Sequence, residues 1–131
     1  MLTRRGFVGC AICALTGFAA TEVGAQTPGL KRTILSRMDG PMAGYETIEA
    51  RVEADPGAII ARHTHPGIET SYIVEGSVEL EIVGEGTRTY SKGEAFQVPV
   101  GAVHGGRVGA TPVVLSGVYV VEKGKPLATP A

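Results

Sequence analysis

Residues 57–76 read GAIIARHTHPGIETSYIVEG, and they contain two of the three histidines in this 131-residue chain. His63 and His65 lie two positions apart on a predicted strand over residues 58–65, so both side chains leave the same face of that strand. A Pro-Gly break follows, and a strand that turns back there can bring the carboxylate of Glu69 beside the two imidazoles. The stretch therefore predicts a cluster of imidazole and carboxylate groups.

The third histidine, His104, lies beyond a Pro-Val-Gly turn and could complete this cluster from a neighbouring strand. Three neutral imidazoles and one carboxylate suit one divalent transition metal ion, such as Fe, Mn, Zn, Ni or Cu. Such a ligand set leaves one or two coordination positions for water or substrate. The alternative is a protein that has these residues without loading an ion.

The rest of the sequence predicts short β-strands. Residues 45–53 and 78–82 alternate apolar with charged side chains, which is the pattern of a half-buried strand. Residues 113–121 are apolar on both faces and suit a strand that is covered on each side or that meets a partner subunit. Glycines and prolines without a fixed period provide turns, and no helical periodicity follows Gln26. Roughly seven or eight antiparallel strands could form a sandwich, a jelly roll or a barrel.

The chain resembles the cupin family of small jelly-roll barrels in two sequence motifs. The first motif consists of Gly57, His63, His65, Glu69 and Gly76, and the second of Gly93, Pro99, Gly101 and His104. Val108 stands where the second motif usually closes with Asn, and this departure removes no metal ligand. The resemblance implies an all-β fold of the cupin type, a double-stranded β-helix or jelly-roll barrel. It also implies that His63, His65, Glu69 and His104 are the metal ligands and point into the barrel.

A metal ion would be the reactive centre of such a protein, because no other pair of groups supplies acid–base chemistry. A redox-active ion could bind a chelating substrate and admit dioxygen, and a Lewis-acid ion could polarise a carbonyl for isomerisation or decarboxylation. The resemblance to dioxygenase cupins implies Glu69 as the catalytic general base. The absence of a Gly-x-Ser-x-Gly motif argues against a nucleophilic serine. The competing hypothesis is a non-catalytic cupin that binds a sugar, a small acid or a metal.

Two further polar residues are candidates for substrate binding. Gln97 and Arg107 could orient a substrate carboxylate or hydroxyl, and a structural hydrogen bond is the equal alternative for each. Few aromatic residues follow Gln26, only Phe96 and four tyrosines, and a stacking platform for a large ring system is hard to assemble from them. We therefore expect a small-molecule substrate or ligand.

The charge balance restricts the partners. Twelve Lys and Arg residues stand against thirteen Asp and Glu residues, and no basic cluster extends beyond two doublets. This distribution provides no electrostatic surface for nucleic acid or anionic lipid. Cupins commonly pair, and the apolar stretch 113–121 is compatible with pairing, so the resemblance implies a homodimer.

The first 25 residues have the character of an export signal. Arg4-Arg5 precede an uncharged, mostly apolar stretch over residues 7–20, which is too short for a stable membrane anchor. The pair resembles a twin-arginine signal, with a Sec signal as the alternative. We expect an exported protein, periplasmic in a Gram-negative-type cell or extracellular. Cys10 and Cys13 would leave with the signal, so the mature chain would have no thiol.

These signals divide the chain into four segments. We predict the export signal over residues 1–25, a polar lead-in over 26–39, the cupin domain over 40–122 and a loose C-terminal tail over 123–131.

Overall fold

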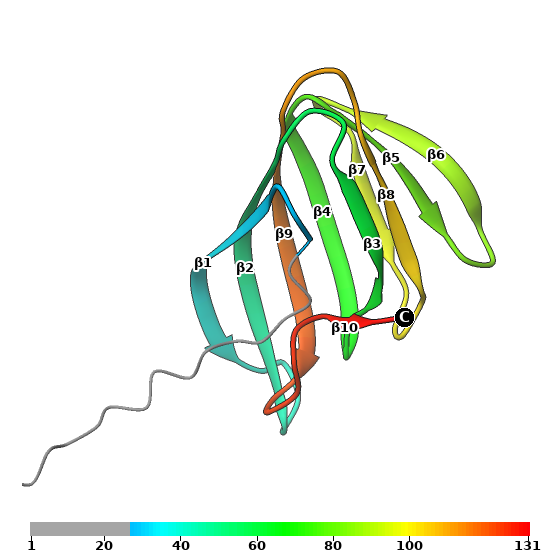
Figure 1. The fold of residues 1–131 in the computed structure, drawn as a ribbon. Coiled ribbons are helices and arrows are strands. Elements are labelled where there is room, and N and C mark those ends of the chain that lie inside the picture. Colours follow the sequence, from blue (N-terminus) through cyan, green and yellow to red (C-terminus); the bar gives the residue numbers. More distant parts are fainter. Residues whose placement is uncertain (1–26) are drawn as a thin grey trace, which may run out of the picture.

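The fold is known from a computed structural model that describes residues 27–131, and within that range it consists of strands and connecting turns (Figure 1). The ten strands are β1 Leu30–Asp39, β2 Tyr45–Ala54, β3 Ile59–Thr64, β4 Gly67–Glu75, β5 Ser77–Ile82, β6 Gly86–Ser91, β7 Ala95–Val98, β8 His104–Val108, β9 Val113–Glu122 and β10 Thr129–Pro130. Among residues 27–131 there is no helix with the length and hydropathy needed to cross a membrane.

The strands form two antiparallel sheets of five. One sheet has the order β1-β2-β9-β4-β7 and the other the order β10-β3-β8-β5-β6. Figure 1 shows the sheets facing each other, with β1 at one edge and the β5–β6 hairpin projecting at the opposite side. The prediction of an all-β jelly roll is therefore confirmed.

The core lies between the sheets because both contribute alternating apolar side chains to it. On β2, residues 48, 50, 52 and 54 are buried, while Arg51 on the opposite face of the strand is exposed. The main cluster joins Val52 and Leu115 of the first sheet to Val78 and Leu80 of the second. This burial stabilises the pairing of the sheets and fixes which side chains enter the barrel.

The segment predicted as a lead-in has a defined structure. Residues 30–39 form β1, which pairs with β2 along its whole length and has a bulge between Ile34 and Ser36. The sequence analysis predicts a polar lead-in over residues 26–39 and no strand there, and the structure adds a strand at residues 30–39. An arginine occupies an inward position, and the bulge shifts the pattern after Ile34, so the period-2 signal is weak in the sequence.

The segment predicted as a loose tail also packs against the barrel. Leu127 and Ala128 are buried, and β10 pairs with β3 through Thr129 and Pro130. In Figure 1 this segment runs across one end of the barrel. The prediction of a loose tail is wrong because two adjacent apolar residues dock into the end of the core. The predicted export signal lies outside the described residues, and the domain boundaries stay predictions.

Two positions of the sequence motifs can be explained from the backbone. Gly76 links β4 to β5 with a φ of 74°, and a Cβ there would lie 2.2 Å from the carbonyl oxygen of Pro112, so only glycine fits. Val108 is buried in the main core cluster and lies opposite Val78 in the β5–β8 pairing. The residue that replaces the usual Asn therefore adds apolar packing.

Candidate metal centre

The three histidines meet inside the barrel. His63 on β3 lies directly opposite His104 on β8, and His65 follows the end of β3. Ring centroids are 4.2 Å apart for His63 and His104, and 4.8 to 5.0 Å apart for the pairs that include His65. One nitrogen from each ring can be chosen so that all three lie within 4.8 Å of one another. The structure thus brings together residues that are 41 positions apart in the sequence.

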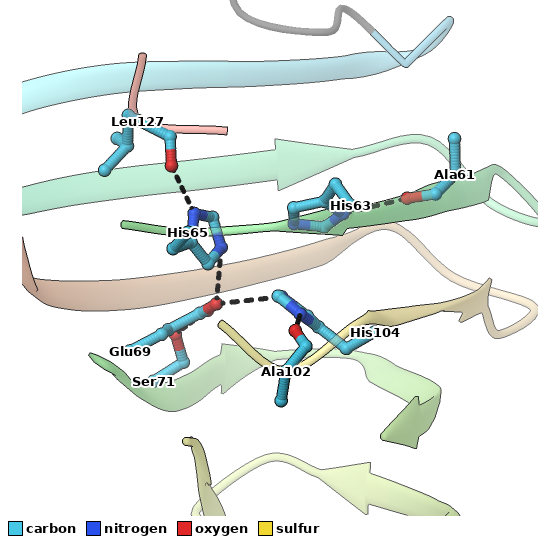
Figure 2. Close-up of polar contacts among 8 residues, drawn as sticks. All are labelled: Ala61, His63, His65, Glu69, Ser71, Ala102, His104 and Leu127. Atoms are coloured by element: carbon cyan, nitrogen blue, oxygen red, sulfur yellow. Dashed lines mark hydrogen bonds and ion pairs between the residues drawn. The ribbon is translucent and has the colours of Figure 1, made fainter. Parts of the chain in front are cut away.

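Each imidazole is oriented by a backbone carbonyl. Nδ1 of His63 lies 2.8 Å from the oxygen of Ala61, and Nδ1 of His104 lies 3.0 Å from the oxygen of Ala102 (Figure 2). Nδ1 of His65 lies 2.5 Å from the oxygen of Leu127, in the segment that crosses the barrel end. A carbonyl oxygen only accepts, so Nδ1 must donate. In the neutral ring, Nε2 then presents a lone pair, which is the form that binds a metal ion.

Glu69 on β4 brings a carboxylate to this cluster from the opposite sheet. Its Oε2 lies 3.0 Å from Nε2 of His65 and 3.3 Å from Nε2 of His104. Its Oε1 accepts a 2.6 Å hydrogen bond from the hydroxyl of Ser71, which is completely buried (Figure 2). Alternation along β4 directs both side chains into the barrel. The site therefore links the two sheets.

The electrostatic environment keeps His63 and Glu69 in their metal-binding forms. Burial lowers the pKa of His63 from 6.5 to about 4, so this ring is neutral at physiological pH. Burial alone would raise the pKa of Glu69, but hydrogen bonding to the imidazoles of His104 and His65, with a proton between them and the carboxylate, and to the hydroxyl of Ser71 outweighs it. The pKa of Glu69 therefore lies below its ordinary value, and the carboxylate is ionised.

The Nε2 atoms of His65 and His104 fit a cation. Both are buried, and neither has a hydrogen-bond partner of acceptable geometry, although the carboxylate oxygen of Glu69 is close to both. Two nitrogen lone pairs beside a carboxylate oxygen repel one another unless a positive charge lies among them. That charge is either a proton on an imidazole or a metal ion. Imidazole and carboxylate donors together suit a divalent transition ion, so His63, His65, His104 and Glu69 fit the expected group.

A small cavity of about 40 Å³ lies beside the cluster. Its walls are apolar except for His63, Glu69, His104, Arg32 and the hydroxyl of Tyr119. Few polar groups on an apolar wall are typical of a ligand site, because they fix the orientation of what binds. The cavity limits its contents to small molecules or to one end of a larger one.

Two residues beside the site were not predicted to be part of it. Tyr119 is 1% exposed, and its ring meets that of His65 edge-on at 4.9 Å between centroids. Burial raises the pKa of Tyr119, and the charge of Glu69 raises it further, so the phenol stays protonated. Arg32 reaches the cavity from β1. The sequence signal for an inward Arg32 is the alternation that places residues 30, 32 and 34 on one face of the strand. This pattern is short, and it ends at the bulge after Ile34.

The two residues predicted to bind substrate lie elsewhere. Gln97 is exposed between the buried residues Phe96 and Val98 and donates a hydrogen bond to the hydroxyl of Thr70 on the outer face. Arg107 is exposed on β8. Strand alternation turns both side chains outward. The structure therefore does not bring Gln97 or Arg107 to the histidine cluster.

Comparison with known proteins identifies a matching family and solved structures with a similar fold. The family described as Cupin domain matches residues 50–122. The solved structure of KdgF from Halomonas sp. is 26% identical with a TM-score of 0.61, and the alignment covers 74% of this chain and 83% of that one. No curated protein matches the chain.

Two less similar structures show the fold alone. An uncharacterized conserved protein with a double-stranded beta-helix domain from Klebsiella pneumoniae is 21% identical with a TM-score of 0.64, covering 84% of this chain and 90% of that one. The DMSP lyase DddQ from Ruegeria pomeroyi is 20% identical with a TM-score of 0.65. That alignment covers 78% of this chain but only 51% of the lyase.

Proposed function

The chain belongs to the cupin family, and on that premise we propose that it binds one divalent transition metal ion and uses it on a small oxygenated substrate. The observation that carries this proposal is the convergence of His63, His65 and His104 with the carboxylate of Glu69 around buried nitrogen atoms that lack hydrogen-bond partners. A structural polar cluster would pair these atoms, because unsatisfied buried nitrogens destabilise a fold.

Each residue has a defined part in this proposal. His63, His65, His104 and Glu69 hold the ion, and the carbonyl partners of the histidines keep the Nε2 lone pairs directed to it. A bound ion would supply either redox chemistry with dioxygen or Lewis-acid polarisation of a carbonyl. Glu69 is the general base, because its carboxylate is ionised and lines the cavity. The apolar walls exclude water from the reacting groups.

The first experiment is elemental analysis of the protein purified without a His-tag. We expect close to one transition ion per chain, and its loss in the His63→Ala/His65→Ala variant. Near one Fe, Mn or Cu would lead to oxygen-consumption assays with small enols and diphenols. Near one Zn or Ni would lead to isomerase, lyase and decarboxylase assays. A metal content no higher than that of the variant would refute the metal centre and favour a non-catalytic cupin that binds a sugar or small acid.

The role of Glu69 has a separate test. Glu69→Gln keeps the side-chain volume but removes the charge that accepts a proton. We expect the variant to keep the fold and most of the metal and to lose turnover. Undiminished turnover at full metal content would refute the general-base role.

We also propose a homodimer. On the outer face of the first sheet, Ile68, Tyr72 and Val74 of β4 are exposed, and Val118 and Val120 on β9 lie beside them only half-buried. Uncharged apolar side chains grouped in this way favour a subunit contact. Sedimentation equilibrium should give twice the chain mass, and Tyr72→Lys should shift it to the monomer. A wild-type monomer would refute the pairing.

The export signal over residues 1–25 is proposed on the sequence alone. A twin-arginine signal carries proteins that are already folded, which suits a protein that loads its ion before export. Cell fractionation should find the wild type in the periplasm and the Arg4→Lys/Arg5→Lys variant retained in the cytoplasm. Equal export of both would favour the Sec pathway.

A further inference from the structure

Arg32 is an arginine at an inward position of the edge strand β1. Its register partner on β2 is the core residue Val52. Alternation along the strand therefore directs the side chain into the barrel. There it lines the same cavity as His63, Glu69 and His104.

The guanidinium of Arg32 has no anionic partner among the residues that the structure describes. No carboxylate of residues 27–131 lies within ion-pair distance of it, whereas the outward Arg51 on the neighbouring strand pairs with Glu53 at 3.2 Å. The Nε of Arg32 is buried without a hydrogen-bond acceptor. Arg32 is half-buried, and a donor that is buried without an acceptor destabilises the fold, so this N–H calls for an acceptor in what the cavity binds.

The ring of Tyr119 holds the guanidinium beside the site. Cζ of Arg32 lies 5.7 Å from the centroid of this ring, which is a cation–π contact. The same ring packs edge-on against His65. The ring of Tyr119 thus contacts both the guanidinium and His65, and its hydroxyl is close enough to take part in a hydrogen bond with the guanidinium. The Nε donor of Arg32 remains without an acceptor.

The charges around the cavity favour an anion. Within residues 27–131, Glu69 is the only acidic residue that lines it, and its two oxygens contact Ser71, His65 and His104. Arg32 therefore offsets the one negative charge of the lining, and a divalent ion would make the cavity net positive. Apolar walls strengthen the attraction of such a cavity for an anion, because they exclude water that would screen it.

We propose that Arg32 recognises the carboxylate of a small organic acid in this cavity. The planar guanidinium can donate two parallel N–H bonds to a carboxylate, a geometry that a neutral ligand does not match as well. This inference deepens the proposed function, since it names short-chain organic anions as the substrate class of the same site. The volume of the cavity sets the upper limit on the size of the bound end.

The test measures binding and does not depend on turnover. The probe is glycolate, a small anion with a carboxylate and a hydroxyl, and its uncharged analogue glycolamide is the control ligand. Both are titrated calorimetrically into zinc-loaded wild-type protein and into three variants: Arg32→Gln, Arg32→Lys and Arg51→Gln. Zinc affinity of each variant is measured separately by competition with a chelator, and thermal unfolding confirms that each variant folds.

We expect the wild type and Arg51→Gln to bind glycolate roughly tenfold or more tightly than glycolamide. Arg32→Gln should lose that preference while its zinc affinity is unchanged, and Arg32→Lys should keep part of it. The proposal would be overturned if Arg32→Gln still preferred glycolate over glycolamide, or if the zinc-loaded wild type did not bind glycolate. Failure of the wild type to bind zinc would instead refute the metal centre, and glycolate binding by the metal-free protein would then test Arg32 alone.

Discussion

Ser71→Ala removes the one hydroxyl among residues 27–131 that donates to Glu69. Ser71 is 0% exposed, and its Oγ lies 2.6 Å from Oε1 of the carboxylate, a distance typical of a hydrogen bond to an ionised acceptor. Hydrogen bonds to charged groups contribute about 1.5–3 kcal/mol, and the carboxylate stays buried when the donor is removed. We therefore expect the free energy of unfolding of the metal-free protein to fall by about 2 kcal/mol. The loosened carboxylate should also weaken zinc binding by about tenfold or more.

The assay is urea unfolding at neutral pH, followed by far-UV circular dichroism. Ser116→Ala on β9 is the matched control, since its hydroxyl lies on the outer face at 3.4 Å from Glu49 and is only partly buried. This control should change the unfolding free energy by no more than about 0.5 kcal/mol. Equal losses in the two variants, or a loss below about 0.5 kcal/mol in Ser71→Ala, would refute the reasoning.

Three other predictions concern the metal and the segment around it. Zinc at a hundred times its dissociation constant should stabilise the wild type by about 2.7 kcal/mol in calorimetry and leave His63→Ala/His65→Ala unchanged. Metal-free protein should lose stability as the pH falls from 6.5 to about 4. Burial lowers the pKa of His63, so the unfolded chain takes up the proton at a higher pH than the folded protein does. A urea unfolding midpoint that stays constant over that range would contradict this. Truncation after Pro126 removes the carbonyl of Leu127 that orients His65 and should lower zinc affinity by about tenfold, whereas truncation after Ala128 retains it.

The strands and the cluster could be predicted because their signals are local or regularly spaced. Alternation in β2 and β5 shows which face is buried, and the motif around His63 and His65 places both imidazoles on one face. The sequence alone offers His104 as a candidate for the cluster, and the resemblance to cupins assigns it there, because the pairing of β3 with β8 joins distant parts of the sequence. Long-range pairing leaves no mark in a local pattern.

The polar surroundings of the site could not be predicted for a related reason. An arginine that points into a barrel cannot be distinguished by sequence from an exposed one, so the alternation that includes Arg32 does not by itself indicate a strand. Gln97 and Arg107 lie near the second motif in sequence, but that nearness does not determine which face of a strand they occupy. The carbonyl of Leu127 could not be found at all, because every residue has one.

The ligands of the candidate metal centre come from both sheets, with the histidines on one and Glu69 on the other. A bound ion would therefore cross-link the sheets and close a loop of roughly 40 residues between His63 and His104, much as a disulfide shortens an unfolded chain. Residues 27–131 contain no cysteine, so this stretch cannot form a disulfide of its own. Reducing agents would then not change the stability of this stretch, whereas the concentration of free metal would. A chelator would destabilise it in the way that a reducing agent destabilises a disulfide-linked protein.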